Sequence, residues 1–351
     1  MSEMYVHAPR RCRGKSRQSG ALIVLRDCIA FVVVLLIFAL FHHALPMRLT
    51  PAGERRAAMA AEQPQSPQEQ AQYLPTSASV PSQAEMPPQT ETLPEPTLAP
   101  TPAPGDFSAG FPAEDTGVGA LYSYQTDSVR IAINRIQTNG VTYFVADVYV
   151  KNIEAFRTAF ANGTYGKGIH AFPTETAAAN GAVFAVSGDY YSARSKGIVV
   201  RNGELYRDVV GQDSCVLFKT GEMKTFYGSE PDLTDFESQQ IWQAWSFGPP
   251  LLAEDGGTLS NFDSQLSGKH PRCGIGYYAP GHYCFVVVDG RQQGYSVGIS
   301  LAGFSQMFHD LGCLKAYNLD GGATAIMMFN GEVINQPYKG GRQSGDIIYF
   351  K

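Results

Sequence analysis

The chain has 351 residues, with 27 basic and 32 acidic side chains and a formal net charge of -5. General nucleic-acid-binding proteins usually carry a basic surplus, so this balance argues against a nucleic-acid partner. Of the 22 prolines, 12 lie between Pro64 and Pro112, whereas 30 of the 36 glycines lie between Gly119 and Gly345. The sequence therefore predicts a non-globular first part and one globular domain over residues 119–351.

The N-terminal segment predicts a membrane anchor. Residues 1–27 form a basic tail, and an apolar run begins at Cys28 and continues to Phe41; extended to Met47 it reaches 20 residues. That is about the length that crosses a bilayer. The basic excess before the run predicts a cytoplasmic tail, a transmembrane signal anchor over residues 28–47 and an extracytoplasmic C-terminal domain on the cell membrane. A cleaved signal peptide is the alternative, although the small-residue site at 57–61 lies far beyond the apolar run.

Residues 48–118 predict a disordered linker. They are rich in Pro, Gln, Thr, Ser and Glu and contain few large apolar residues. Such a segment cannot bury enough surface to offset the entropy lost on ordering.

The spacing of the four cysteines in the domain matches no zinc-binding pattern; they are Cys215, Cys273, Cys284 and Cys313. One disulfide among them is an open possibility, and its connectivity cannot be read from the sequence.

Short apolar segments separated by turn residues predict hairpins in the globular part. The predicted pairs are Val129–Ile136 with Val141–Val150, Gly197–Val200 with Glu204–Arg207, and Cys215–Lys219 with Met223–Tyr227. Short helices are predicted over Asn152–Phe160 and Thr174–Asn180, followed by a strand over Ala182–Ser187.

The last 80 or so residues predict a β-α-β unit. Tyr283–Val288 and Leu314–Leu319 are typical of buried strands, and Ser300–Leu311 has the spacing of an amphipathic helix. These two strands are expected to be parallel. Further strands are predicted over Ala325–Phe329, Val333–Asn335 and Asp346–Phe350. The predicted fold class is α+β, with a mixed, largely antiparallel sheet, hairpins and flanking helices.

Polar side chains at strand ends are the candidates for chemistry. Asp320 follows a predicted strand and precedes Gly321 and Gly322, so backbone could approach a ligand there. Asp189 follows another predicted strand. Tight turns alone would explain both patterns. Arg272 begins an apolar, Gly-rich strand and needs a partner, which is either a structural carboxylate or an anionic substrate.

Seven segments, in order along the domain, resemble the phosphodiester glycosidase family. They are Ala185–Tyr191, Gly197–Gly203, Phe247–Leu251, Pro271–Gly276, Val286–Arg291, Asn318–Gly322 and Asn330–Gly331. The resemblance implies a hydrolase that cleaves a sugar-1-phosphodiester at the anomeric C–O bond. A phosphate ester is a good leaving group, so the reaction needs a cation for the departing phosphate and a carboxylate for the sugar cation or the water.

The resemblance places the catalytic roles on Asp320, Asp189 and Arg272, with the two carboxylates' roles open. It assigns substrate binding to Asn318, Gly321, Gly322, Thr324, Gly188, Tyr190, Tyr191, Asn335 and Arg342. No cofactor is required, although two carboxylates beside a phosphate could hold a divalent metal. The expected partner is a phosphorylated glycan or wall polysaccharide, such as an exopolysaccharide. The predicted anchor would also attach the chain to the membrane.

Two departures from the family pattern support an alternative. Ser187 stands where the family has Asn, and Ile326 stands where Thr is common. Loss of these polar groups would suit a weak or inactive polysaccharide-binding scaffold on the same fold. A transferase that moves a glycan to an acceptor is a third hypothesis.

Overall fold

The computed structural model describes residues 104–351 except residues 115, 210, 229, 230, 232 and 234, and these belong to one compact unit. The predicted basic tail, the predicted anchor over residues 28–47 and most of the predicted linker lie outside the described residues. Within the described part, no helix is long and apolar enough to cross a membrane.

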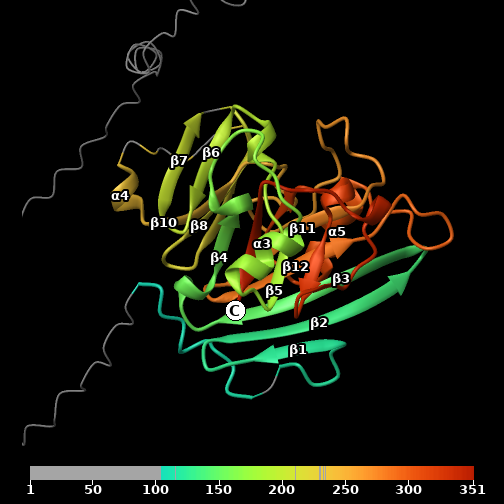
Figure 1. Ribbon diagram of the computed structural model, residues 1–351, viewed down its shortest axis with the longest axis horizontal. Helices are drawn as coiled ribbons and strands as arrows, with labels where there is room; N and C mark the ends of the chain where they lie inside the picture. The colour runs from blue at the N-terminus through green and yellow to red at the C-terminus, as the bar shows by residue number, and fades with distance from the viewer. Residues whose placement is uncertain (1–103, 115, 210, 229–230, 232, 234) are drawn as a thin grey trace, which may run out of the picture. The chain divides into compact units, whose positions relative to one another are not determined.

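The largest sheet has six strands in the order β1-β2-β3-β12-β11-β13, and its β2–β3 hairpin runs along one side of the unit (Figure 1). Its strands are β1 (Tyr122–Gln125), β2 (Val129–Thr138), β3 (Val141–Val150), β11 (Arg272–Ala279), β12 (His282–Val288) and β13 (Lys315–Leu319). Every neighbouring pair is antiparallel. The predicted hairpin turn at Asn139-Gly140 has positive φ at both residues, as a tight hairpin turn requires.

The predicted β-α-β unit is present as β12, α5 (Leu301–Asp310) and β13. Since β12 and β13 each pair antiparallel with β11, they run parallel to each other with β11 between them. Because no neighbouring strands are parallel, the predicted mixed sheet is wrong: the sheet is antiparallel throughout, and the two parallel strands of the β-α-β unit are not neighbours. Leu301, Phe304 and Phe308 of α5 are buried on the sheet. A Cβ on Gly274 would lie 2.9 Å from the ring of Phe304, so this glycine lets the helix approach closely.

A second sheet has five antiparallel strands in the order β7-β6-β10-β8-β9. They are β6 (Gly197–Arg201), β7 (Glu204–Val209), β8 (Ser214–Phe218), β9 (Met223–Phe226) and β10 (Ile241–Trp245), with the short α4 (Phe236–Gln239) before β10. The two predicted hairpins are confirmed. The central strand, β10, was not predicted from the sequence.

A third sheet has the order β15-β14-β5-β16-β4, again antiparallel. Its strands are β4 (Arg157–Phe160), β5 (Phe184–Ser187), β14 (Met327–Phe329), β15 (Glu332–Val333) and β16 (Asp346–Phe350). The predicted helix before β5 is confirmed as α3 (Pro173–Asn180). Short 3-10 turns complete the chain: η1 (Ile153–Ala155), η2 (Ala161–Gly163), η3 (Tyr191–Ala193), η4 (Gly322–Thr324) and η5 (Tyr338–Gly340).

The helix predicted over Asn152–Phe160 is wrong. The side chain of Asn152 does accept a bond from the N–H of Ala155, as a helix cap would, but only the single turn η1 follows. The chain then becomes β4, which pairs with β16. Pairing with a strand near the other end of the domain decides the conformation here, and the local capping signal cannot reveal it.

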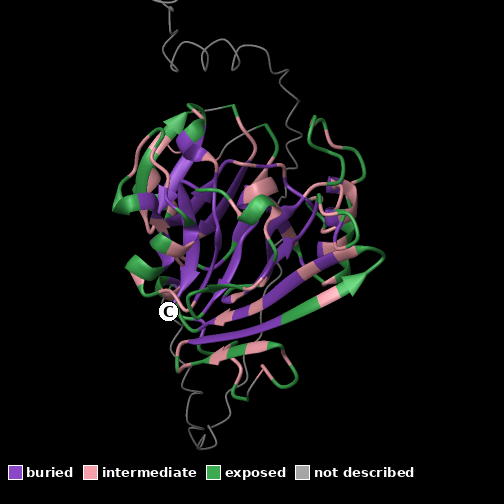
Figure 2. Cartoon of the chain, turned by 45° about the vertical axis from the view of Figure 1, so that its right-hand side comes forward, coloured by how far each residue is buried: buried purple, intermediate pink, exposed green. Residues whose placement is uncertain are grey.

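The three sheets meet around the buried ring of Phe156. Its centroid lies 5.9 Å from Phe285 on β12, 5.3 Å from Phe350 on β16 and 6.0 Å from Trp245 on β10. Figure 2 shows the buried interior that the sheets share and the exposed tip of the β2–β3 hairpin. The described residues are thus mostly antiparallel sheet with few helices.

The folded unit begins before the predicted domain start at Gly119. The N–H of Phe107 donates to the carbonyl of Lys151, and the Phe107 ring is only 8% exposed in the main core. A Cβ on Gly281 would lie 2.6 Å from Phe107, so the ring fills a space that this glycine leaves open. The Pro-rich composition around Phe107 concealed this one anchoring aromatic residue.

Candidate active site

A cavity of about 340 Å³ lies where β11, β12 and β13 reach the same edge of the six-stranded sheet. We call it the cationic cavity, because five cationic side chains line it: Arg194, Arg272, Arg291, Lys339 and Arg342. Asp320 is the one carboxylate among its described lining residues. Such an excess of positive charge favours an anionic ligand.

Asp320 is held rigidly at the end of β13. Its backbone N–H donates to the carbonyl of Gly188, 3.1 Å away, which joins the ends of β13 and β5. A Cβ on Gly321 would lie 2.8 Å from the carbonyl oxygen of Pro271, so the residue after Asp320 must be glycine. The Thr324 hydroxyl donates to the Gly321 carbonyl at 2.6 Å. The backbone around the carboxylate is therefore fixed from both sides.

The Asp320 residue is 5% exposed, and burial raises the pKa of its carboxyl to about 6. A hydrogen bond from Thr324 and the charge of Arg342 act in the opposite direction. Arg342 Nη2 lies 3.3 Å from Asp320 Oδ2. Asp320 is thus ionised near neutral pH and protonated in moderate acid, which suits a group that takes part in proton transfer.

Arg272 is a buried cation without a carboxylate partner among the described residues. It is 4% exposed, and its guanidinium donates to the carbonyls of Leu266, Gly268 and Ile299, the last two at 2.8 and 3.3 Å. Burial, and then the charge of Arg291, lower its pKa to about 10, so it remains charged at neutral pH. Backbone carbonyls orient this guanidinium, and no described carboxylate neutralises its charge.

Arg291 reaches the cavity from the turn after β12. Its Nη2 donates to Nδ1 of His270 at 3.2 Å, and its guanidinium lies 5.5 Å from the ring centroid of Tyr338. Burial, Arg272 and Arg291 together lower the pKa of His270, which keeps the imidazole neutral. His270 therefore accepts from Arg291 and helps to fix its position.

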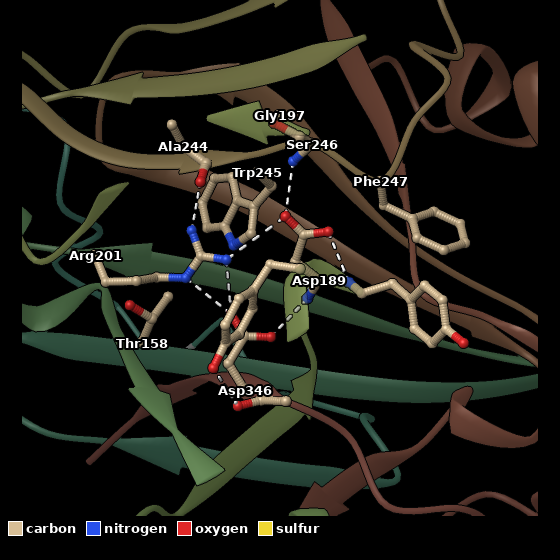
Figure 3. Close-up of polar contacts among 12 residues, drawn as sticks. Thr158, Asp189, Gly197, Arg201, Ala244, Trp245, Ser246, Phe247 and Asp346 are labelled. Atoms are coloured by element: carbon tan, nitrogen blue, oxygen red, sulfur yellow. Dashed lines mark hydrogen bonds and ion pairs between the residues drawn. The ribbon is translucent and has the colours of Figure 1, made fainter. Parts of the chain in front are cut away.

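Asp189 lies behind the cavity wall and does not line it. Its Oδ1 accepts from the N–H of Tyr190 at 2.6 Å and its Oδ2 from the N–H of Ser246 at 2.7 Å. In Figure 3 the guanidinium of Arg201 lies between the carboxylates of Asp189 and Asp346, at 3.6 Å and 2.7 Å. Because both oxygens of Asp189 are committed, the carboxylate holds the loops of Tyr190 and Phe247 against the cavity.

Asp346 completes this buried cluster at the start of β16. Its Oδ1 accepts from the N–H of Asp189 at 2.7 Å, and Arg201 Nε donates to its Oδ2 at 2.8 Å. Burial raises the pKa of Asp346 to about 6, although Arg201 acts against the rise. A Cβ on Gly188 would lie 2.5 Å from Asp346 Oδ1, so only glycine fits there. Gly188 shapes the wall rather than lining the cavity.

The structure separates the predicted site residues into groups. Those that line the cationic cavity are Asp320, Arg272, Gly321, Gly322, Tyr190 and Arg342. Asn318 lines the adjoining cavity, and Thr324 braces the loop after Asp320. Tyr191 and Asn335 are elsewhere: the Tyr191 hydroxyl donates to the carbonyl of Gly345, and the Asn335 amide donates to Asp289.

Sequence reasoning missed several lining residues. They are Arg194, His270, Arg291, Phe247, Tyr338 and Lys339. Phe247 and Arg291 stood inside quoted motifs, so their position was a usable signal. Tyr338 and Lys339 come from η5, a loop that carries no motif. Among the described residues, no group of three or more His, Cys, Asp or Glu side chains could hold a metal ion.

Comparisons with known proteins identify the family and the fold. The family model described as phosphodiester glycosidase (NAGPA) matches residues 180–351. The SPbeta prophage-derived uncharacterized protein YomE of Bacillus subtilis is 30% identical over 146 residues, which is 40% of this chain and 22% of YomE. The chain thus spans about a fifth of that relative's length.

Two solved structures share the fold. The catalytic domain of zebrafish N-acetylglucosamine-1-phosphodiester alpha-N-acetylglucosaminidase, auto-inhibited by its pro-peptide, has a TM-score of 0.53 at 18% identity, covering 66% of this chain and 85% of that one. A hypothetical protein from Synechocystis has a TM-score of 0.51 at 13% identity, covering 66% and 64%. All residues that line the cationic cavity fall within the matched range, and residues 180–351 are a domain of the phosphodiester glycosidase family.

Proposed function

We propose that this domain hydrolyses the anomeric C–O bond of a sugar-1-phosphodiester. The observation that carries the proposal is the composition of the cationic cavity, with one buried carboxylate among five cations. A neutral glycoside would not need such charge. A phosphodiester does, because its phosphate gains a second negative charge when the C–O bond breaks and the electron pair moves to the phosphate oxygen.

Three residues that line the cavity have separate roles in this reaction. Arg272 and Arg291 hold the phosphate and stabilise the charge that it gains. The leaving phosphate needs little protonation, so no strong acid is required beside it. Ionised Asp320 stabilises the oxocarbenium-like sugar and accepts a proton from the attacking water.

The two departures from the family pattern do not reach this cavity. Ser187 is fully buried at the end of β5, and its Oγ has no hydrogen-bond partner in the described structure. Ile326 is buried in the core beside β5 and β16. Neither residue lines the cationic cavity. This placement supports an active enzyme over an inactive scaffold.

The assay is hydrolysis of a panel of glycosyl-1-(4-nitrophenyl phosphates) carrying glucose, galactose, mannose or N-acetylglucosamine. Cleavage at the anomeric carbon releases free sugar and 4-nitrophenyl phosphate, which becomes coloured only after a phosphatase is added. Colour without phosphatase would mean P–O cleavage and would overturn the proposed bond. Binding without turnover of any substrate would favour the scaffold. Sugar appearing on an added acceptor instead of as free sugar would favour the transferase.

We also propose that the domain works outside the cell, anchored to the membrane by residues 28–47, on a surface or exopolysaccharide phosphodiester. The proposal rests on the apolar run and its basic flank. Membrane fractionation of the full chain and of a variant lacking residues 28–47 tests it. Recovery of the full chain in the soluble fraction, or resistance to protease added outside intact cells, would count against it.

A further inference from the structure

Four of the residues that line the cationic cavity come from two loops that are far apart in sequence. Arg291 lies in the turn after β12, residues 289–296, whereas Tyr338, Lys339 and Arg342 lie in the η5 loop, residues 336–342. The two loops meet where the guanidinium of Arg291 lies 5.5 Å from the ring centroid of Tyr338. This side of the cavity therefore keeps its shape only if the two loops are held in a fixed relative position.

Asp289, the first residue after β12, connects the two loops and does not itself line the cavity. It is fully buried. Its Oδ2 accepts from the N–H of Gln336 at 3.0 Å, in the η5 loop, and from the hydroxyl of Tyr295 at 2.8 Å, in the turn that carries Arg291. Its Oδ1 accepts from Nδ2 of Asn335 at 2.7 Å, next to the η5 loop. One carboxylate thus binds donors from both loops.

Asn335 extends this connection to the third sheet. Its Nδ2 also donates to the carbonyl of Ala325 at 2.9 Å, and its Oδ1 accepts from the N–H of Met327 on β14 at 2.8 Å. Together with the bond to Asp289, these contacts pair both polar atoms of the amide. Asn335 therefore ties the residue before the η5 loop to β14 as well as to Asp289.

The backbone between Asp289 and Arg291 is closely packed. A Cβ on Gly290 would lie 2.7 Å from Cα of Gly298 and 2.8 Å from the backbone nitrogen of Pro271, so only glycine fits. Arg291 has a φ of 58°, a left-handed conformation that costs free energy for a residue with a side chain. The surrounding structure must hold Arg291 in that conformation, and the hydrogen bonds to Asp289 anchor the residue from which the turn begins.

We propose that Asp289 is a positioning residue for the phosphate site. It acts through Arg291 and the η5 loop, because its carboxylate fixes both loops while lying outside the cavity. An ionised carboxylate only accepts hydrogen bonds, and all three of its side-chain partners are donors, so the connection depends on the charged form. The inference rests on the proposed function in one respect, that the ligand of Arg291 is a phosphate.

The test is Asp289→Asn, which keeps the size of the side chain but replaces one acceptor oxygen by a donor. The amide then faces at least one of the three donors, so one connection is lost. Arg291 should move from Nδ1 of His270, and the pKa of His270 should rise in an NMR titration, since the charge of Arg291 lowers it. The rise should be part of the one that Arg291→Ala produces. Calorimetry should show methyl phosphate binding about fivefold more weakly.

Tyr283→Phe is the matched control. Tyr283 lies at the other end of β12, is fully buried, and donates its hydroxyl to the carbonyl of Gly221 at 2.9 Å. Loss of that bond should lower the free energy of unfolding, as Asp289→Asn does. It should change neither the pKa of His270 nor the binding of methyl phosphate. The comparison separates a positioning role from a general loss of stability.

A less stable Asp289→Asn with an unchanged His270 pKa and unchanged methyl phosphate binding would overturn the inference. If this variant does not fold, Tyr295→Phe decides. It removes only one of the three hydrogen bonds, at a partly buried side chain, so it should keep the fold. It should move both measured quantities in the same direction by a smaller amount, and no change in either would overturn the inference.

Neither measurement needs turnover, so the two proposals can fail separately. Changes in both quantities in a domain that hydrolyses none of the nitrophenyl substrates would remove the proposed hydrolysis and leave the role of Asp289. Hydrolysis by a domain whose Asp289→Asn variant binds methyl phosphate as tightly as the wild type, with the same His270 pKa, would remove this inference alone.

Discussion

Replacing Asp320 with asparagine should make the domain more stable and much less active. Burial raises the pKa of Asp320 from 3.8 to about 6. The folded state therefore binds this proton more tightly than the unfolded chain does. The carboxyl is compatible with folding at low pH, and its ionisation destabilises the fold as pH rises towards 6. At 1.36 kcal/mol per pKa unit, the shift corresponds to about 3 kcal/mol at pH 7.

Asparagine keeps the shape and cannot ionise, so Asp320→Asn should recover up to this amount at pH 7. For a domain of this size the melting temperature should rise by about 6–12 °C. About half of the gain should remain at pH 5, and little below pH 4, because the wild-type carboxyl is protonated there. Turnover should fall by ~10² or more, and wild-type kcat/KM should rise with pH through about 6.

Thermal denaturation at pH 4, 5 and 7 and turnover of the nitrophenyl phosphodiesters test both parts together. Asp208→Asn, at an exposed position on β7, is the control and should change neither the melting temperature nor the turnover. A stability difference that does not depend on pH would refute the burial argument. A variant with wild-type turnover would remove Asp320 from the catalytic residues, whatever its stability.

Arg291→Ala should weaken phosphate binding about tenfold or more, with little loss of stability. It should also raise the pKa of His270 in an NMR titration, because the charge of Arg291 lowers that pKa. An unchanged His270 pKa would contradict the contact between the two side chains. Refolding of the reduced, denatured domain with a small-molecule disulfide should join Cys284 to Cys313, whose buried sulfurs lie 3.5 Å apart in the folded state, and should raise the free energy of unfolding by about 3–4 kcal/mol. Peptide mapping that shows any other pair would disprove the predicted connectivity. Phe107→Ala should lower the free energy of unfolding by about 3 kcal/mol in denaturant unfolding. An effect near zero would mean that the residues around Phe107 belong to the linker and not to the folded domain.

The parts of the fold that depend on local pattern could be predicted. The helix α5 has the apolar spacing of its buried face, β12 is apolar from Tyr283 to Val288, and β13 has apolar side chains at Ala316, Tyr317 and Leu319, so the β-α-β unit follows from the sequence. Hairpins with Asn-Gly turns were equally clear. In contrast, β4 is a strand because it pairs with β16, and nothing within residues 152–160 encodes that partner.

The candidate site shows the same division. Asp320 and Asp189 have the same signature in sequence, an acid at the end of an apolar strand. Only the structure shows that Arg201 and Asp346, from β6 and β16, enclose Asp189 and leave Asp320 facing the cavity. The sequence also does not reveal how many cationic side chains line the cavity, because Lys339 and Arg342 come from a loop far along the chain from Arg194.

The packing of Phe107 also places the first described residues away from the cationic cavity. Phe107 lies against Gly281, in the turn that joins β11 to β12, whereas Arg272 and Asp320 lie at the other end of the same strands. The eight residues of β11 separate the two ends by about 25 Å. The described chain therefore joins the sheet at the edge opposite the cationic cavity. None of the described residues that precede β1 lines the cationic cavity, so this N-terminal segment leaves the cavity mouth uncovered.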